Sequence, residues 1–348
     1  MQPSFKALLL TVATIGAAST VQAASVQEIA NYNGADRQSV LEAGARKEGK
    51  VTIYCTGTQL DPIAKALETK YPFLKVELYR LTPVEIARRV TEDYKAGVHN
   101  VDTFELSSNG LIAINNQGIV IPFYTPEAAG FSEEAWGPKR HWLAARESYV
   151  GFGVNTNVIP LAQAPKTFED LLNPSLKGKM GLVATVSTAN TWTGTLLLTK
   201  GEEFIKKLGS QAIRGYDMTG RALANLTITG EVPFSPTTFN SHVFESKKSG
   251  APIEWIDPDA VSVIDTSVTI AKNAPHPHAA MLMIDFALSK PGQEIYMSTG
   301  YNSPRADIQN MGTVPKKKLY LGSRPDFLNE FEQWGKLYDR YIKGGGKV

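Results

Sequence analysis

The fold class is decided by residues 51–104, which read VTIYCTGTQLDPIAKALETKYPFLKVELYRLTPVEIARRVTEDYKAGVHNVDTF. Three short apolar runs in this stretch, at 51–54, 76–79 and 101–104, predict buried strands. Two amphipathic helices are predicted between them, one opening with Asp61-Pro62 and one with the capping box Thr82-Pro83-Val84-Glu85. Strands that alternate with helices in this way predict an open α/β sheet with parallel strands.

The rest of the chain predicts a second α/β unit. Runs at 149–154, 180–183 and 232–234 predict further strands, and VSVIDTSVTI at 261–270 is long enough to cross from one unit to the other. Residues 278–288 predict a helix with a buried face. The length of 348 residues and the apolar fraction of 43% suffice for two domains with a sizeable core.

The N-terminal residues predict export. Met1–Lys6 carries one positive charge, residues 7–18 are apolar, and Val21-Gln22-Ala23 is a small-residue cleavage pattern. The apolar run is shorter than the roughly 20 residues that a membrane-spanning helix needs. The single cysteine, Cys55, excludes an internal disulfide and does not follow the cleavage site, so no lipid anchor is expected. We therefore expect residues 1–23 to be a signal peptide and the mature protein to diffuse freely in a bacterial periplasm.

The charge balance and the absence of common enzyme motifs argue against several classes of function. The chain has 36 Lys and Arg residues against 34 Asp and Glu residues, which argues against a nucleic-acid-binding surface. It lacks a Walker phosphate loop, a Gly-x-Ser-x-Gly elbow and a His-Glu-x-x-His motif, so we do not expect an enzyme. Cys55 is either a nucleophile at a strand end or a small buried residue. His276 and His278 either hold a metal or start a helix. We expect no metal and no cofactor.

Four polar loops are expected to follow strands, two in each α/β unit. In an open α/β sheet, ligands bind outside the carboxyl ends of the strands. Backbone N–H groups at helix starts, together with short hydroxyls, favour anionic groups such as carboxylate or phosphate. Any one loop is better explained by helix capping, but four loops in two units favour a ligand cleft. The loops are Thr56-Gly57-Thr58, Ser107-Ser108-Asn109, Ser187-Thr188-Ala189-Asn190, and Thr237-Thr238 with Asn240.

Residues 274–293, APHPHAAMLMIDFALSKPGQ, carry a family resemblance. They are similar to the "HP-x-A-A … DF-x-LS-x-x-GQ" signature of the periplasmic solute-binding proteins of ABC importers. The chain looks most like the branch with ferric-ion, thiamine, phosphonate and sugar-phosphate binders. The segments 153–156 (GVNT), 248–255 (KSGAPIEW) and 301–305 (YNSPR) resemble further parts of the same pattern in the same order. The resemblance spans nearly all of the mature chain.

The resemblance implies a type II periplasmic-binding-protein fold. This α/β fold has two lobes, each a mainly parallel sheet flanked by helices, joined by two crossing hinge strands. The crossings are expected near 149–154 and 263–270. The first lobe would then contain residues 24–150 and 264–348, and the second lobe residues 151–263.

The same resemblance implies a solute but does not name it. Ferric-ion binders of this branch hold iron with an adjacent tyrosine pair, in a loop that reads TTFNSH at 237–242 here and has no tyrosine. Direct iron binding is therefore not expected, although Glu105 lies where such proteins often place an acid. We expect a monomer that captures a small, anionic organic solute and delivers it to an inner-membrane ABC permease. The alternatives are a ferric-ion or ferric-chelate binder and an exported enzyme that uses Cys55.

The residues expected to contact the solute are loop residues with hydroxyl, amide or backbone donors. An arginine would neutralise the anion and an aromatic residue would pack on an apolar portion. These residues are Thr56, Gly57, Thr58, Arg80, Ser107, Ser108, Thr188, Asn190, Thr238, Asn240 and Tyr301, with Arg305 and Trp192 as further candidates.

Overall fold

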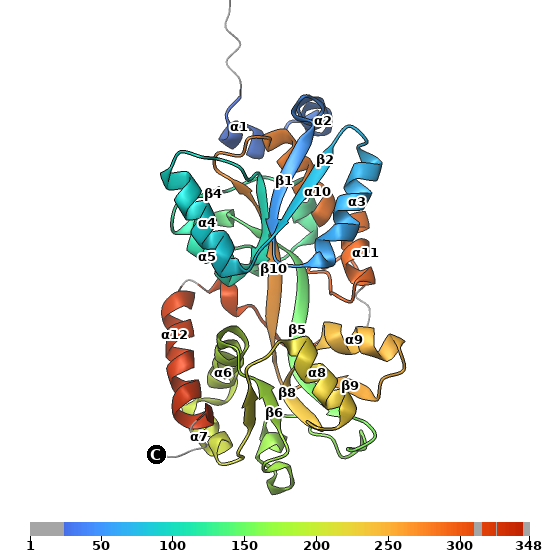
Figure 1. Cartoon of the computed structure of the whole chain (residues 1–348), viewed down its shortest axis with the longest axis vertical. Coiled ribbons are helices and arrows are strands. Elements are labelled where there is room, and N and C mark those ends of the chain that lie inside the picture. Colours follow the sequence, from blue (N-terminus) through green and yellow to red (C-terminus); the bar gives the residue numbers. More distant parts are fainter. Residues whose placement is uncertain (1–23, 310–314, 325, 344–348) are drawn as a thin grey trace, which may run out of the picture.

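Two α/β lobes, one above the other, make up the computed structural model, which describes residues 24–309, 315–324 and 326–343 (Figure 1). The upper, first lobe contains helices α1–α5, α10 and α11, and the lower, second lobe contains α6–α9 and α12 (Figure 1). Two long strands, β5 (Leu143–Asn155) and β10 (Val261–Ala271), run through both. The expected signal peptide, residues 1–23, lies outside the described residues.

After two helices that were not predicted, at residues 26–30 and 37–48, the first lobe shows the predicted alternation of strands and helices. Strand β1 pairs in parallel with β2 and β3, with Val51 opposite Val76 and Ile53 opposite Thr103. The Thr82 N–H donates to Glu85 Oε2 at 2.8 Å, so the predicted capping box forms. The elements are α1 (Val26–Ala30), α2 (Arg37–Glu48), β1 (Lys50–Cys55), α3 (Asp61–Lys70), β2 (Lys75–Arg80), α4 (Pro83–Lys95), β3 (Thr103–Ser107), α5 (Ser108–Asn115) and β4 (Val120–Ile121).

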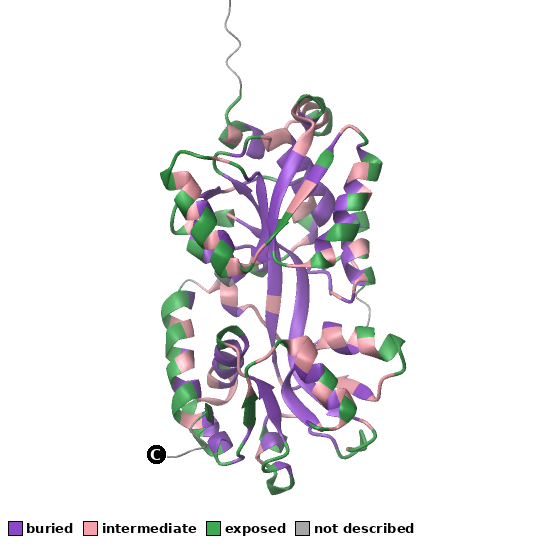
Figure 2. Cartoon of the chain, in the orientation of Figure 1, coloured by how far each residue is buried: buried purple, intermediate pink, exposed green. Residues whose placement is uncertain are grey.

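The crossing strands β5 and β10 pair with each other in antiparallel fashion, from Ser262 opposite Val150 to Val268 opposite Leu143. They are buried along almost their whole length (Figure 2). The sheet continues from β10 to β3 in the first lobe and from β5 to β8 in the second lobe. The predicted crossings are thus confirmed, although β5 begins earlier than expected, and β10 pairs antiparallel to β3 and β5 antiparallel to β8.

The second lobe contains two of the polar segments that were expected to be loops, and here the prediction is wrong. Residues 187–190 form the first turns of α6, Thr237 and Thr238 lie inside β8, and Asn240 begins α9; in the first lobe, residues 108 and 109 likewise begin α5. Ser, Thr and Asn suit the first turn of a helix as well as a loop. The elements are β6 (Gly181–Val183), α6 (Val186–Lys200), α7 (Glu202–Gly209), β7 (Arg214–Tyr216), α8 (Gly220–Thr229), β8 (Phe234–Phe239), α9 (Asn240–Lys248) and β9 (Ile253–Ile256).

The C-terminal part of the chain serves both lobes. Helices α10 (Pro277–Leu288) and α11 (Lys290–Ser298) cover the first lobe, as predicted. Strand β11 (Lys318–Leu319) then pairs with β10, and α12 (Phe327–Leu337) packs on α6 of the second lobe. A Cβ atom at Gly194 would lie 2.4 Å from the Trp334 side chain, so this glycine lets the two helices approach closely. The expectation that all residues after 264 lie in the first lobe therefore does not hold for α12.

Each lobe has its own apolar core, as expected for two structural units. The first core includes Ile53, Phe104 and Met283, and the second includes Phe152 and Phe234. In the described ranges, no helix combines the length and the apolar character that crossing a membrane requires.

Candidate functional site

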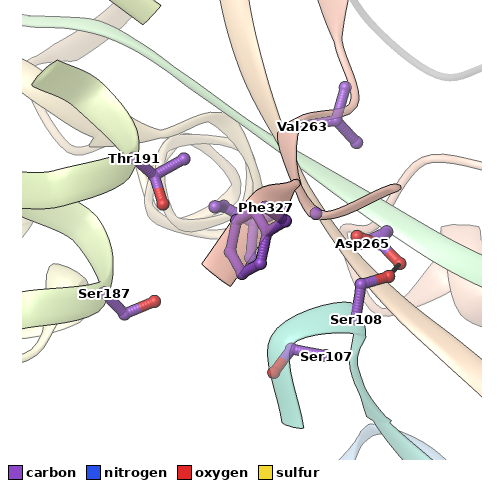
Figure 3. A pocket seen from close by; sticks show the side chains of 9 residues that line it. Ser107, Ser108, Ser187, Thr191, Val263, Asp265 and Phe327 are labelled. Carbon is purple, nitrogen blue, oxygen red and sulfur yellow. Dashed lines mark hydrogen bonds between the residues drawn. The ribbon is translucent and has the colours of Figure 1, made fainter. Parts of the chain in front are cut away.

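A small cavity of about 40 Å³ lies between the two lobes, beside the crossing strand β10 (Figure 3). Both lobes contribute to its wall, the first through the start of α5 and the second through α6. The start of α12 closes it with an aromatic ring. The side chains around it are Ser107, Ser108, Ser187, Thr191, Asp265 and Phe327.

Asp265 is the charged residue of this wall. It lies on β10, and only 7% of its surface is exposed. Its Oδ2 atom accepts hydrogen bonds from Ser108 Oγ at 2.5 Å and from Ser267 Oγ at 2.6 Å. Burial raises the pKa of the Asp265 carboxyl, and the two hydroxyl donors act in the opposite direction. The carboxylate is thus held in place with hydroxyl partners and without an ion pair among the described residues.

Of the predicted site residues, the structure brings Ser107 and Ser108 to the cavity. Thr188 is buried near it on α6 and accepts a hydrogen bond from Thr185 Oγ1 at 3.3 Å. Asn190 instead donates to the Phe331 carbonyl at 3.1 Å. Its role in this structure is to join α6 to α12.

The loop after β1 is held by Arg80. The Arg80 Nε donates to the Gly57 carbonyl at 3.3 Å, and its guanidinium also pairs with Asp61. Thr56 and Thr58 are exposed. Arg80 is therefore already paired within the first lobe, and none of these loop residues lines the cavity.

Three predicted residues lie along β5 rather than around the cavity. Asn240 Oδ1 accepts a hydrogen bond from the Tyr149 N–H at 2.8 Å, which fastens the start of α9 to β5. The Arg146 guanidinium lies 4.3 Å from the centre of the Tyr301 ring. Thr238 is buried on β8, and its hydroxyl has no partner among the described residues.

The two further candidates are structural. Arg305 pairs with Glu127 and Asp307 and also donates to the Leu288 carbonyl at 2.8 Å, all within the first lobe. Trp192 is buried in the core of the second lobe.

A buried ion pair at the crossing was not predicted from the sequence. Arg146 on β5 donates from Nε to Glu105 Oε1 at 2.9 Å, and Tyr296 donates to the same oxygen at 3.3 Å. Burial alone would lower the pKa of Arg146, but Glu105 together with Tyr301 and Tyr296 outweighs burial and raises that pKa. Glu105 Oε2 is buried without a partner in the described part of the chain. The sequence signal for this pair was Arg146 itself, a charged residue inside the apolar run that starts at Leu143.

A second missed cluster joins β5 to the C-terminal segment. Glu147 is fully buried and accepts hydrogen bonds from Tyr149 at 2.9 Å, from Lys318 Nζ at 2.9 Å and from Tyr320 at 2.5 Å. Burial raises the pKa of Glu147, and Lys318 opposes this effect. The segment that carries Lys318 is thus anchored to a crossing strand.

Two candidate sites remained open from the sequence: Cys55 as a nucleophile, and His276 with His278 as metal ligands. Cys55 is fully buried, and burial, with a smaller effect of Glu105, raises its pKa to about 11. A thiol with that pKa stays protonated at neutral pH, so the structure favours a core role for Cys55. His276 bonds Asp102 and His278 bonds Glu48, and both contacts hold the start of α10. Over the described residues, no group of three or more His, Cys, Asp or Glu side chains is placed to hold a metal.

The family of this chain follows from its match to a known protein-family model. The model of the bacterial extracellular solute-binding proteins matches residues 113–327, which is more than half of the chain. The chain belongs to this family. An uncharacterized protein of Haemophilus influenzae is 25% identical to this solute-binding protein over 289 residues, which cover 75% of this chain and 79% of the relative.

Solved structures share the two-lobed fold of this solute-binding protein. Iron-bound HitA from Pseudomonas aeruginosa matches with a TM-score of 0.70 and 20% identity, over 83% of this chain and 98% of that chain. AfuA from Actinobacillus pleuropneumoniae, with fructose-6-phosphate bound, matches with a TM-score of 0.69 and 22% identity, over 85% and 99%. The ferric iron-binding protein A of Mannheimia haemolytica, in an open conformation, matches with a TM-score of 0.72 and 15% identity, over 86% and 100%. These likenesses confirm the type II fold class.

Proposed function

We propose that this protein is the periplasmic solute-binding component of an ABC importer. In this role it captures a small anionic organic solute between its lobes and delivers it, as a monomer, to an inner-membrane permease. The family assignment supports the binding role, and the interlobe cavity supports the place of capture. A freely diffusing carrier also agrees with the export signal expected at residues 1–23.

The start of helix α6 is the feature that favours an anionic solute. Val186, Ser187 and Thr188 occupy its first turn, where no side chain caps the backbone N–H groups. The first turn of α5 across the cavity is likewise uncapped by a side chain. Such N–H groups lack acceptors within their own helix and favour negatively charged partners. By contrast, Thr82 caps α4.

Titration calorimetry with carboxylates, phosphonates and sugar phosphates tests this function. We expect at least one of these anions to bind the wild-type protein with a one-to-one stoichiometry. If none binds, the solute is not a small anion.

Two proline substitutions at helix starts test whether the anion binds at the start of α6. Val186→Pro removes one N–H group at the first helical position of α6, where proline is tolerated and the side chain is exposed. We expect this variant to fold normally and to bind the anion about tenfold more weakly. Glu202→Pro makes the same change at the exposed start of α7, away from the cavity, and is expected to leave binding unchanged. Equal effects of the two variants would contradict the placement at α6.

Ferric-ion binding remains the second candidate because several solved structures with this fold are ferric-binding proteins. Ferric ions prefer hard anionic oxygen ligands, and residues 237–242 offer no phenolate. We expect the purified protein to stay colourless after loading with ferric citrate. A visible charge-transfer band that a chelator removes would instead establish iron as the cargo.

A further inference from the structure

The buried carboxylate of Asp265 places an acceptor in the cavity between the lobes. Its Oδ2 atom is occupied by the hydroxyls of Ser108 and Ser267, whereas no side chain bonds its Oδ1 atom in the described structure. Oδ1 lies 3.8 Å from the position that a Cβ atom on Gly322 would take, and Gly322 is part of the cavity wall. This acceptor oxygen therefore lies at the cavity side of the carboxylate.

The other polar side chains of the wall are hydroxyls. Ser107, Ser187 and Thr191 surround the space that Asp265 borders, and no lysine or arginine lies among the described residues that line it (Figure 3). Arg146, whose charge reaches Asp265, is already paired with Glu105. The wall thus offers one charged acceptor together with groups that can both donate and accept.

The cavity is large enough for only part of a solute. A volume of about 40 Å³ has room for two or three water-sized groups. A carboxylate oxygen that a bound solute covers is stabilised when a donor of the solute meets it and destabilised when none does. The group that enters this space should therefore donate a hydrogen bond, while Phe327 supplies an apolar wall for its carbon atoms.

We propose that Asp265 accepts a hydrogen bond from a hydroxyl group of the bound solute, so that the protein selects hydroxylated anions over anions of the same charge without hydroxyls. This inference rests on the proposed function, in which the helix starts hold the anionic group. A hydroxyl fits better than an ammonium group because the wall hydroxyls exchange donors and acceptors with hydroxyls, whereas an ammonium only donates. Rejection of a solute that leaves a buried polar group unpaired is a strong form of selection.

Matched pairs of anions test the proposal by calorimetry. The probes are glycerol 3-phosphate against propyl phosphate and tartrate against succinate, with 2-aminoethyl phosphate as the ammonium probe and sorbitol as the neutral polyol. In the wild type, we expect the hydroxylated member of a pair to bind about tenfold or more tightly than its partner. Asp265→Asn should reduce this ratio to about threefold or less. Asp257→Asn removes a half-buried carboxyl that does not line the cavity, and should leave the ratio unchanged.

Thr191→Val is the second variant, in case Asp265→Asn fails to fold. It replaces a wall hydroxyl by a methyl group of similar shape, and we expect it to lower the same ratio.

Equal binding of both members of every pair overturns the selection of hydroxyls and leaves the proposed function standing. Tighter binding of 2-aminoethyl phosphate than of glycerol 3-phosphate, lost in Asp265→Asn, overturns the choice of a hydroxyl. Binding of sorbitol but of no anion, again lost in Asp265→Asn, overturns the proposed anionic cargo and supports the role of Asp265. No binding of any probe overturns both proposals.

Discussion

The Ser108 hydroxyl donates to Asp265 Oδ2 at 2.5 Å, and this contact fastens the first turn of α5 to the crossing strand β10. A helix that follows a strand of the first lobe is thereby tied to a strand that runs into the second lobe. The same carboxylate borders the space between the lobes. If the proposed role of Asp265 holds, one pair of residues contributes both to stability and to solute binding.

Ser108→Ala should destabilise the protein. The substitution removes a donor from a buried carboxylate, which costs about 1–3 kcal/mol in the free energy of unfolding. Urea unfolding followed by circular dichroism measures this loss. Ser262→Ala is the matched control, because the Ser262 hydroxyl is equally buried but has no partner in the described structure. We expect the control to be neutral or slightly stabilising, and equal losses in both variants would argue against the Ser108–Asp265 contact.

Removing Arg146 should be far more costly than removing an exposed lysine. Arg146→Met leaves the buried Glu105 without its counter-charge, which costs about 3–5 kcal/mol in the free energy of unfolding. Glu105→Gln in the same chain should restore part of this loss. The control is Lys336→Met, which breaks an exposed pair with Glu332 and should cost less than about 1 kcal/mol. A double-mutant cycle in urea measures the coupling between Arg146 and Glu105, and a coupling near zero would contradict the buried pair.

Cys55 should not react in the folded protein. Because burial raises its pKa to about 11, the thiolate is scarce at neutral pH and the sulfur is inaccessible. Ellman's reagent should therefore label the native protein slowly and the unfolded protein at one thiol per chain. Fast labelling of the native protein, blocked by a bound solute, would instead support an enzyme that uses Cys55 as its nucleophile.

The stability of the protein should fall as the pH drops below the ordinary pKa of histidine. Burial, with a smaller effect of Arg221, lowers the pKa of His242 on α9 from 6.5 to about 4. Between these two values the unfolded chain binds a proton at this position and the folded chain does not, so acidification favours unfolding. His242→Gln should remove about 1 kcal/mol of the stability lost between about pH 7.5 and about pH 5.5. Urea unfolding at both pH values checks this, and an unchanged loss in the variant would exclude His242 as its source.

Local patterns were sufficient to predict the run from β1 to β3 and the crossing strands, but not helices α1, α2 and α5. The Thr82–Glu85 capping box and the alternation of apolar runs depend on neighbours in the sequence, and both are present in the structure. The polar segments were misplaced because Ser, Thr and Asn suit loops and helix starts alike. As a result, the segments at Ser108 and Ser187 were expected to be loops although they begin helices.

The candidate site was harder to predict because its contacts join distant parts of the chain. Asn190 looks like a ligand residue in its local sequence, but its partner is the Phe331 carbonyl on α12. Asp265 lies inside a strand-forming run, and only the fold brings Ser108 to it. The arginines were also hard to assign, because Arg80 is paired with Asp61 at the surface and Arg146 is paired with Glu105 in the interior.

The proposed cargo is tested most directly by identifying the small molecule that the denatured protein releases. The protein is purified from the periplasm of its own cells without a refolding step and then denatured, and the supernatant is analysed by mass spectrometry. We expect about one equivalent of a small organic anion that carries at least one hydroxyl group. Release of one equivalent of iron, or of a solute without an acidic group, would contradict this expectation.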